Sequence, residues 1–153
     1  MQQRARSMSR SQFVAEHPHP FLLVHGTAGT GALPFATNVS ATSDLANQAP
    51  PEIFAVQKSA ANPYSDRISI GRARNCDIVL RDASVSKLHA HFVVDGNGGF
   101  TLVDQGSRNG ITLNSRPLKG GERLTSGDEL VFGSVMVEFL DALAIFQMFV
   151  SDY

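Results

Sequence analysis

From Pro51 onward the sequence consists of short apolar alternations separated by turn residues, roughly every 8 to 12 positions. Alternating apolar and polar residues are typical of strands with one buried face, whereas an amphipathic helix places its apolar residues three or four positions apart. Regularly spaced strands of this kind are typical of an antiparallel sandwich or barrel. The pattern therefore predicts an all-β fold, a sandwich of two antiparallel sheets.

Eight strands are expected in this region: Glu52–Lys58, Arg67–Ile70, Asp77–Leu80, Leu88–Asp95, Phe100–Asp104, Ile111–Asn114, Glu129–Phe132 and Val135–Leu140. Period-2 spacing predicts these core-facing residues: Ile68, Ile70, Ile78, Leu80, Leu88, Ala90, Phe92, Val94, Phe100, Leu102, Ile111, Leu113, Val135, Val137 and Phe139. Asp95–Gly99 is expected to close a hairpin, and Asn109–Gly110 suits a tight turn.

The regions outside this pattern differ in composition. Residues 1–18 begin with an Arg-rich, acid-free stretch and are expected to form a disordered tail, followed by an N-terminal extension or arm over 19–50 that contains a short strand at Phe21–Val24. The sandwich domain is expected over 51–141. In the apolar segment 142–153, Leu143, Phe146 and Val150 fit one helical face. A short helix packed on the sandwich is the preferred interpretation, and a contact with a second copy of the chain is the alternative.

Composition excludes several classes of protein. Of the 153 residues, 42% are hydrophobic and 18% charged, which excludes a wholly disordered chain or a coiled coil. Thirteen basic and fourteen acidic residues leave a net charge of -1, so we expect neither nucleic acid nor an anionic membrane as partner. Cys76 is the only cysteine, which excludes an intrachain disulfide and favours a reducing, cytoplasmic location.

No set of residues predicts catalysis. The glycine-rich run Gly26–Gly31 lacks the Lys-Ser or Lys-Thr pair of a phosphate-binding Walker loop, and no G-x-S-x-G nucleophile motif occurs. His89 and His91 share a predicted strand face, which makes a two-ligand metal site geometrically feasible, but no third ligand has suitable spacing. We therefore expect no enzyme, no cofactor and no metal.

Cationic side chains are concentrated in three predicted loops. They are Arg72, Arg74, Arg81, Lys87 and Arg108. Loops from separate strand pairs gather at one end of a sandwich, so these cations are expected to meet there, beside Ser84, Ser86, Ser107 and Asn109. Guanidinium groups, hydroxyls and backbone amides together suit a phosphoryl group. The alternative interpretation is that the charges only solvate the loops.

The order and spacing of six motifs resemble the forkhead-associated (FHA) domain family. The motifs are Ile70–Arg72, Cys76–Leu80, Val85–Ala90, Asp104–Gly110, Gly127–Asp128 and Phe132–Gly133. The resemblance covers about residues 51–141, and nothing before it matches the family core. It implies an FHA-type, eleven-stranded β-sandwich whose apical loops bind phosphothreonine in a partner protein. Ile111 departs from the threonine that usually follows the Asn-Gly pair.

The resemblance also implies roles for individual residues. Arg72 and Ser86 correspond to the phosphate-contacting arginine and serine, and Lys87 supplies a further cation. Arg108 lies where family members contact phosphate or flanking residues, and Asn109 corresponds to the asparagine that binds the peptide main chain. Four residues are expected to support the loops: Gly71, His89, Gly106 and Gly110.

The expected function is that of a phosphothreonine-peptide binding module, a non-catalytic adaptor in Ser/Thr kinase signalling. Its expected partner is a Thr-phosphorylated protein or peptide, either a Ser/Thr kinase or a kinase substrate. The alternative is a structural or assembly protein that uses the faces of an FHA-like sandwich for contacts that do not depend on phosphorylation.

Overall fold

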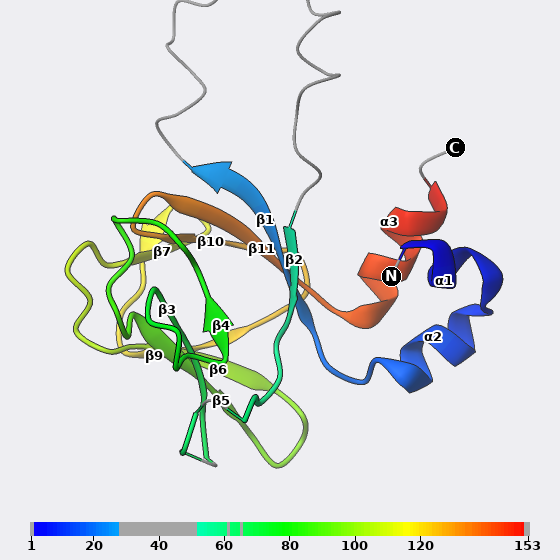
Figure 1. Ribbon diagram of the computed structural model, residues 1–153, viewed down its shortest axis with the longest axis horizontal. Helices are drawn as coiled ribbons and strands as arrows, with labels where there is room; N and C mark the ends of the chain where they lie inside the picture. Colours follow the sequence, from blue (N-terminus) through cyan, green and yellow to red (C-terminus); the bar gives the residue numbers. More distant parts are fainter. Residues whose placement is uncertain (1, 28–51, 61, 65, 152–153) are drawn as a thin grey trace, which may run out of the picture.

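Two β-sheets packed face to face form the body of the protein (Figure 1). The computed structural model describes residues 2–27, 52–60, 62–64 and 66–151. The six-stranded sheet has the order β2-β1-β11-β10-β7-β8, and the five-stranded sheet the order β4-β3-β5-β6-β9. Every strand pair is antiparallel except β3 and β4, which form a short parallel pair. The predicted all-β sandwich is therefore confirmed, with one parallel exception.

The strands of the first sheet are β1 (Phe21–Thr27), β2 (Glu52–Ala55), β7 (Ile111–Leu113), β8 (Arg116–Pro117), β10 (Asp128–Phe132) and β11 (Val135–Leu140). Those of the second are β3 (Ile68–Gly71), β4 (Ile78–Val79), β5 (Ala90–Val94), β6 (Phe100–Asp104) and β9 (Gly121–Leu124). The sequence pattern missed β8 and β9, because Pro117 and Gly121 interrupt the apolar alternation that identifies a strand.

The core between the sheets contains most of the residues that period-2 spacing predicted. Phe92, Leu102 and Phe132 are fully buried there. Leu88 and Val94 were predicted to face inward but are 47% and 48% exposed. Leu88 precedes β5 and lies in the loop, where His89 is the buried residue instead, and Val94 lies at the hairpin end of β5, where the strand extends past the core.

Strand β1 comes from the predicted N-terminal extension but is an internal strand of the sandwich. It pairs with β11, where Phe21 lies opposite Leu140, and with β2, where Phe21 lies opposite Ala55. The folded sandwich therefore begins well before residue 51. Residues 28–50 of the predicted extension, which include most of the Gly26–Gly31 run, lie outside the described residues.

The first eighteen residues differ from the disordered tail that their composition predicted. They contain α1 (Gln2–Ser7) and α2 (Arg10–Glu16). Ser9 caps α2 through a reciprocal capping box with Gln12, and Phe13 is fully buried. A single buried aromatic side chain gives no helical period in so short a segment, so the sequence pattern did not predict these helices. The packing partner of Phe13 comes from elsewhere in the chain.

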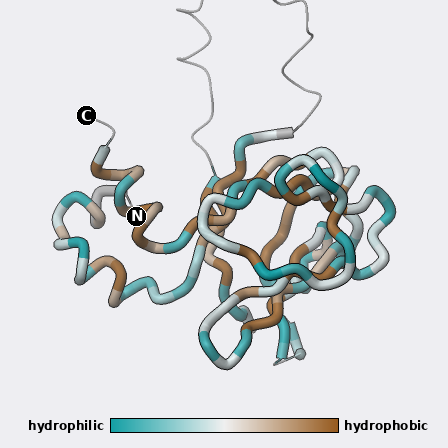
Figure 2. Tube along the Cα trace, turned by 180° about the vertical axis from the view of Figure 1, so that it is seen from behind, coloured by the Kyte–Doolittle hydropathy of each residue, from teal (hydrophilic) through white to brown (hydrophobic). Residues whose placement is uncertain are grey.

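That partner is α3 (Ala142–Ser151), the predicted C-terminal helix, which contacts both N-terminal helices. The Phe13 and Phe146 rings lie 5.5 Å apart. The predicted apolar face is offset, because Ala142, Ile145 and Phe149 are buried whereas Val150 is 46% exposed. The three helices form a lobe beside the sandwich, and hydrophobic stretches occur in the helices as well as in the strands (Figure 2).

The lobe has its own hydrophobic cluster, separate from the core between the sheets. It consists of Ala5, Phe13, Phe21, Leu23, Leu140, Ala142, Ile145 and Phe149. Strands β1 and β11 therefore bury side chains on both of their faces. Within the described ranges, no helix has the length and apolar character needed to cross a membrane.

Candidate functional site

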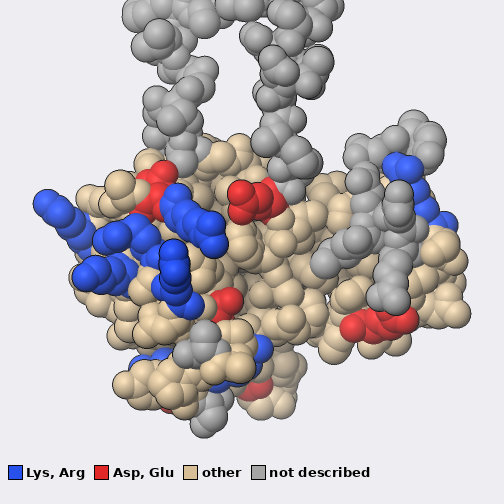
Figure 3. Space-filling view, in the orientation of Figure 1, with Lys and Arg blue, Asp and Glu red and all other residues tan. Residues whose placement is uncertain are grey.

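The predicted loops meet at one end of the sandwich, around a surface hollow of about 400 Å³ that we call the apical depression. Its lining residues are Arg72, Ala83, Ser84, Val85, Ser86, Lys87, Leu88, Arg108 and Asn109. All five residues predicted to bind a phosphopeptide are among them. Figure 3 shows Lys and Arg side chains gathered over this end of the molecule.

Main-chain hydrogen bonds hold the β3–β4 loop against the β4–β5 loop. Arg72 N donates to Ser86 O, and Ala73 N donates to Lys87 O, both at 3.0 Å. The two loops approach so closely that a Cβ on Gly71 would collide with the Lys87 carbonyl oxygen. Only glycine fits at position 71, which agrees with the supporting role predicted for it.

The Arg72 side chain is anchored at one nitrogen and open at the others. Its Nε donates to the Val85 carbonyl at 3.0 Å. A guanidinium group has five N–H donors, so about four remain for an external acceptor. Because the anchor restricts the side chain, less conformational entropy is lost when Arg72 binds an anion.

Ser86 links the β4–β5 loop to the β6–β7 loop. Its Oγ accepts a hydrogen bond from Arg108 N at 3.0 Å, and the hydroxyl proton is left to donate elsewhere. Its main-chain N donates to His89 Nδ1 at 3.0 Å, while His89 Nε2 lies 2.8 Å from Gly110 O. Since Nδ1 accepts, the proton of the neutral ring is on Nε2, and both ring nitrogens of this fully buried histidine are occupied.

Asn109 is oriented by the loop across the depression. Its Nδ2 donates to Ser84 O at 2.7 Å. One amide N–H and the carbonyl oxygen remain, which is the set that pairs with a peptide main chain. Gly106 and Gly110 have φ angles of 68° and 71°, a conformation that glycine adopts without strain.

Ser84 is in turn held by two residues that were not among the predicted binding residues, although Asp82 was expected to cap a turn. Asp82 Oδ1 accepts from Ser84 N at 2.9 Å and from Ser84 Oγ at 2.6 Å, and Ser134 N donates to Ser84 Oγ at 2.9 Å. The hydrogen bonds from the Ser84 side chain and main chain lower the pKa of the Asp82 carboxyl. The Asp-x-Ser spacing is a local sequence signal of a turn. Ser134 lies 50 residues from Ser84, so no local pattern predicted this contact.

Three cations line the depression without a carboxylate partner. Among the described residues, no acid lies within ion-pair distance of Arg72, Lys87 or Arg108, whereas other cations, such as Arg116 with Glu122, are paired. Two cations predicted at this end, Arg74 and Arg81, do not line the depression; Arg81 lines a separate cavity of about 540 Å³ beside β2 and β4. Three of the five predicted cations therefore line the depression.

The feasible histidine metal site is absent. His89 lies in the loop with both nitrogens occupied, whereas His91 lies on β5 and its Nδ1 pairs with Gln105 Nε2. No group of three or more potential metal ligands occurs among the described residues.

A family model of the FHA domain matches residues 68–133, which include every residue of the apical depression. The chain contains an FHA domain. The glycogen accumulation regulator GarA of Mycolicibacterium smegmatis is 42% identical over 72 residues, which are 47% of this chain and 44% of that protein. The oxoglutarate dehydrogenase inhibitor of Corynebacterium diphtheriae is 41% identical over 71 residues, or 46% of this chain and 48% of that protein. This FHA chain thus spans less than half the length of these relatives.

Solved FHA domains have the same fold. An FHA domain of a Chlamydia trachomatis protein aligns with a TM-score of 0.55 at 20% identity, covering 80% of this chain and 97% of that one. The N-terminal FHA domain of S. cerevisiae Rad53p, in complex with a phosphothreonine peptide, aligns with a TM-score of 0.54 at 16% identity, covering 85% and 98%. At these identities the likeness establishes the fold alone.

Proposed function

We propose that this FHA domain binds phosphothreonine in a partner protein through the apical depression and acts as a non-catalytic adaptor. One observation carries the proposal: Arg72, Ser86 and Lys87 present unpaired donors to a single hollow whose cations have no acidic partner among the described residues. A phosphate dianion matches that set of donors in charge and geometry.

In this proposal each polar group has a distinct role. The free N–H groups of Arg72 and the ammonium of Lys87 bind phosphate oxygens, and the Ser86 hydroxyl donates a short hydrogen bond. Arg108 lies at the rim beside the phosphate, and Asn109 pairs with the peptide main chain. Charge-assisted hydrogen bonds contribute about 1.5 to 3 kcal/mol each, against the desolvation and ordering of the peptide. Affinity on the order of micromolar follows, which suits reversible signalling.

The curated relatives support the adaptor part of the proposal, since their names describe a regulator and an inhibitor. We infer that the partner is a Ser/Thr kinase or a kinase substrate. The free, buried Cys76 is compatible with the reducing cytoplasm in which such a pathway would act.

The decisive experiment uses a degenerate peptide library centred on phosphothreonine, with an unphosphorylated library as control. The wild-type chain should retain only the phosphorylated library. Arg72→Ala should abolish retention, and Arg72→Lys should restore part of it, because an ammonium group lacks the guanidinium fork. Arg74→Ala, in the same loop but outside the depression, is the matched control and should bind like wild type. Phosphopeptide binding that survives Arg72→Ala in folded protein would favour the assembly-protein alternative.

A further inference from the structure

A second pocket lies directly beside the apical depression on the side of Lys87 and Leu88. We call it the Tyr64 pocket; its volume is about 570 Å³. Its lining residues are Asn62, Pro63, Tyr64, Arg67, Ser69, Ala73, Asn75, Cys76, Lys87, Leu88, His91 and Gln105. Lys87 and Leu88 line both hollows, whereas Asn109 lines only the apical depression.

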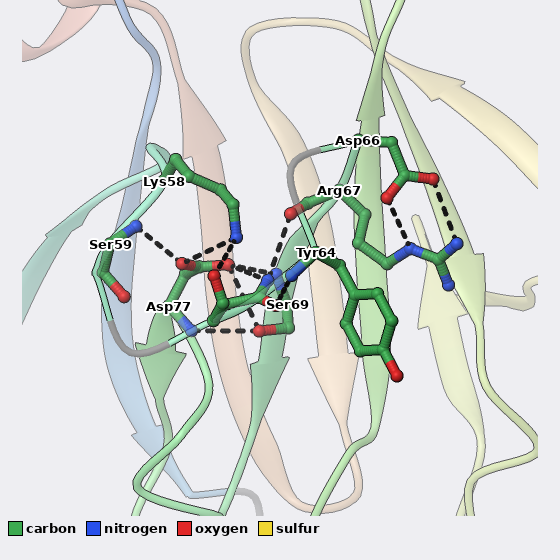
Figure 4. Close-up of polar contacts among 8 residues, drawn as sticks. Lys58, Ser59, Tyr64, Asp66, Arg67, Ser69 and Asp77 are labelled. Carbon is green, nitrogen blue, oxygen red and sulfur yellow. Dashed lines mark hydrogen bonds and ion pairs between the residues drawn. The ribbon is translucent and has the colours of Figure 1, made fainter.

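The outer wall of the Tyr64 pocket is held by a buried carboxylate. Figure 4 shows the Asp77 side chain, which is fully buried, at the centre of contacts from the β2–β3 loop and β3. Asp77 Oδ2 accepts from Asn62 Nδ2 at 2.6 Å, and Asn62 Oδ1 accepts from Tyr64 N at 2.9 Å. This chain of hydrogen bonds fixes the Tyr64 main chain, so the pocket wall is built before any ligand arrives.

Two large side chains are exposed at the pocket. Tyr64 is 60% exposed and Leu88 is 47% exposed, although residues of this size usually bury apolar surface. They line one pocket and so form a single apolar surface rather than scattered exposed residues. Such a surface beside a polar binding site is typical of a place where a ligand side chain packs.

Two cations line the Tyr64 pocket, and one of them, Arg67, is paired with a neighbouring acid. The Arg67 guanidinium lies 5.2 Å from the centre of the Tyr64 ring and pairs with Asp66 at 3.0 Å. Burial lowers the pKa of His91 and raises the pKa of the Cys76 thiol, so both are neutral near pH 7. Lys87, at the shared wall, is the one lining cation without an acid partner among the described residues, and it also faces the proposed phosphate site.

We propose that the Tyr64 pocket binds a bulky uncharged side chain, of leucine or phenylalanine size, from the same phosphorylated segment. This inference rests on the proposed function, because the phosphate bound at Arg72 and Ser86 brings the flanking residue to Leu88. The two hollows share Lys87 and Leu88, so the side chain comes from a residue close to the phosphothreonine, and four extended residues on either side reach about 13 Å. From the phosphothreonine, the peptide runs toward Lys87 and Leu88 and away from Asn109.

The test uses phosphothreonine peptides with four alanines on each side, in which each alanine is replaced in turn by phenylalanine or by glutamate. Calorimetry with the full chain should find one position at which phenylalanine tightens binding about tenfold, as expected for partial burial of an aromatic ring. Glutamate at that position should give no gain, because Arg67 is already paired with Asp66 and Lys87 is shared with the bound phosphate.

Tyr64→Ala should remove the phenylalanine gain while leaving binding of the all-alanine phosphopeptide within about twofold, since Tyr64 does not line the apical depression. Tyr64→Phe keeps the ring and should retain the gain. Val94→Ala, at an apolar residue that is 48% exposed and lies outside the pocket, is the control. Phosphate-dependent binding without a preferred position, or a preference unchanged in Tyr64→Ala, overturns this inference and leaves the proposed function standing. Absence of any phosphate-dependent binding overturns both.

Discussion

At the scale of single residues, Ser86 connects three parts of the apical depression. Its carbonyl oxygen accepts from Arg72 N, its N–H donates to His89, and its Oγ accepts from Arg108 N. The first two bonds use main-chain atoms of Ser86 and are therefore kept in Ser86→Ala. The side chain therefore has only two roles, which are to hold the Arg108 amide and to donate to a bound phosphate.

Ser86→Ala should weaken phosphothreonine-peptide binding by about 1.5 to 3 kcal/mol, roughly tenfold to hundredfold, because a hydrogen bond to a charged group is lost. Thermal stability should change little, since the main-chain contacts remain. Calorimetric titration measures the loss. Ser11→Ala, on the exposed face of α2, is the matched control and should bind like wild type. Equal affinity of Ser86→Ala and wild type would place the phosphate elsewhere.

At the scale of elements, the contact between β3 and the β4–β5 loop positions Arg72 beside Ser86. Gly71 ends β3 at the point where the loop carbonyl of Lys87 passes over it. The Asp77 carboxylate holds the β2–β3 loop against β3, because it accepts hydrogen bonds from Ser59 N at 2.6 Å and from Ser69 N at 2.7 Å. The first contact holds the two site loops together, and the second holds the β2–β3 loop, which carries Tyr64.

Gly71→Ala should weaken phosphopeptide binding and lower the free energy of unfolding by about 1 to 3 kcal/mol, because the new methyl group overpacks a backbone contact. Gly96→Ala is the matched control, since nothing lies within 4 Å of a Cβ at that position. Urea denaturation and calorimetry should separate the two variants. If Gly71→Ala matches Gly96→Ala in both measurements, the close approach of the two loops is not required.

Asp77 should make stability depend on pH in the acidic range. Burial raises the pKa of its carboxyl, but hydrogen bonds from Asn62, Ser59 and Ser69 outweigh burial and place the folded-state pKa below the ordinary value. In the unfolded chain the carboxyl titrates at about pH 4. Its contribution to stability is therefore present above about pH 4 and is lost as the pH falls through the lower, folded-state pKa.

Asp77→Asn should be less stable than wild type at pH 7, on the order of 1 to 3 kcal/mol, because the amide cannot accept all the buried donors. The difference should shrink at pH 3, below the ordinary pKa of the carboxyl, because the unfolded chain then takes up a proton that the folded carboxylate resists. Urea denaturation at both pH values measures it, and Asp66→Asn, an exposed carboxylate, is the control that should change little. A wild-type-like Asp77→Asn at pH 7 would contradict the structural role of this carboxylate.

At the scale of the whole molecule, the two ends of the chain meet in a helical lobe, away from the loops that form the apical depression (Figure 1). The lobe covers the outer face of β1 and β11 with Phe13, Ile145 and Phe149. Because α3 buries its apolar face against this chain's own helices and strands, the fold needs no second copy to cover that face.

Deleting residues 142–153 should lower the melting temperature and the solubility, because Phe13, Phe21 and Leu23 lose their cover. Phosphopeptide binding by the protein that stays soluble should be retained, since no residue of α3 lines the apical depression. Differential scanning calorimetry and a binding titration measure the two effects. An equally stable and soluble truncation would show that the lobe is dispensable.

Single substitutions in α3 provide the finer test. Ile145 is fully buried, and Ile145→Ala should reduce the free energy of unfolding by about 2 to 5 kcal/mol. Val150→Ala, at a position 46% exposed, should stay within about 0.5 kcal/mol of wild type. The reverse ranking would mean that α3 packs on the face predicted from sequence, through Leu143, Phe146 and Val150.

The features of this protein that follow from its sequence are encoded in local patterns. The strand alternation defines the sandwich, because side chains of a strand point to opposite faces at every step. The chemistry of the site is also local, since Arg72, Ser86 and His89 lie in short motifs with characteristic spacing, and the general placement of such loops at one end of a sandwich follows from topology. The five predicted binding residues therefore line one hollow in the structure.

Other features depend on contacts between segments that are distant in the chain, and the folded structure was needed to find them. The N-terminal helices pack on α3 from the other end of the chain, and Ser134 supports Ser84 from 50 residues away. The Tyr64 pocket likewise combines four loops with β3 and β5. No residue spacing within one segment encodes these contacts, because a face of a segment becomes buried only when that segment packs against its partner.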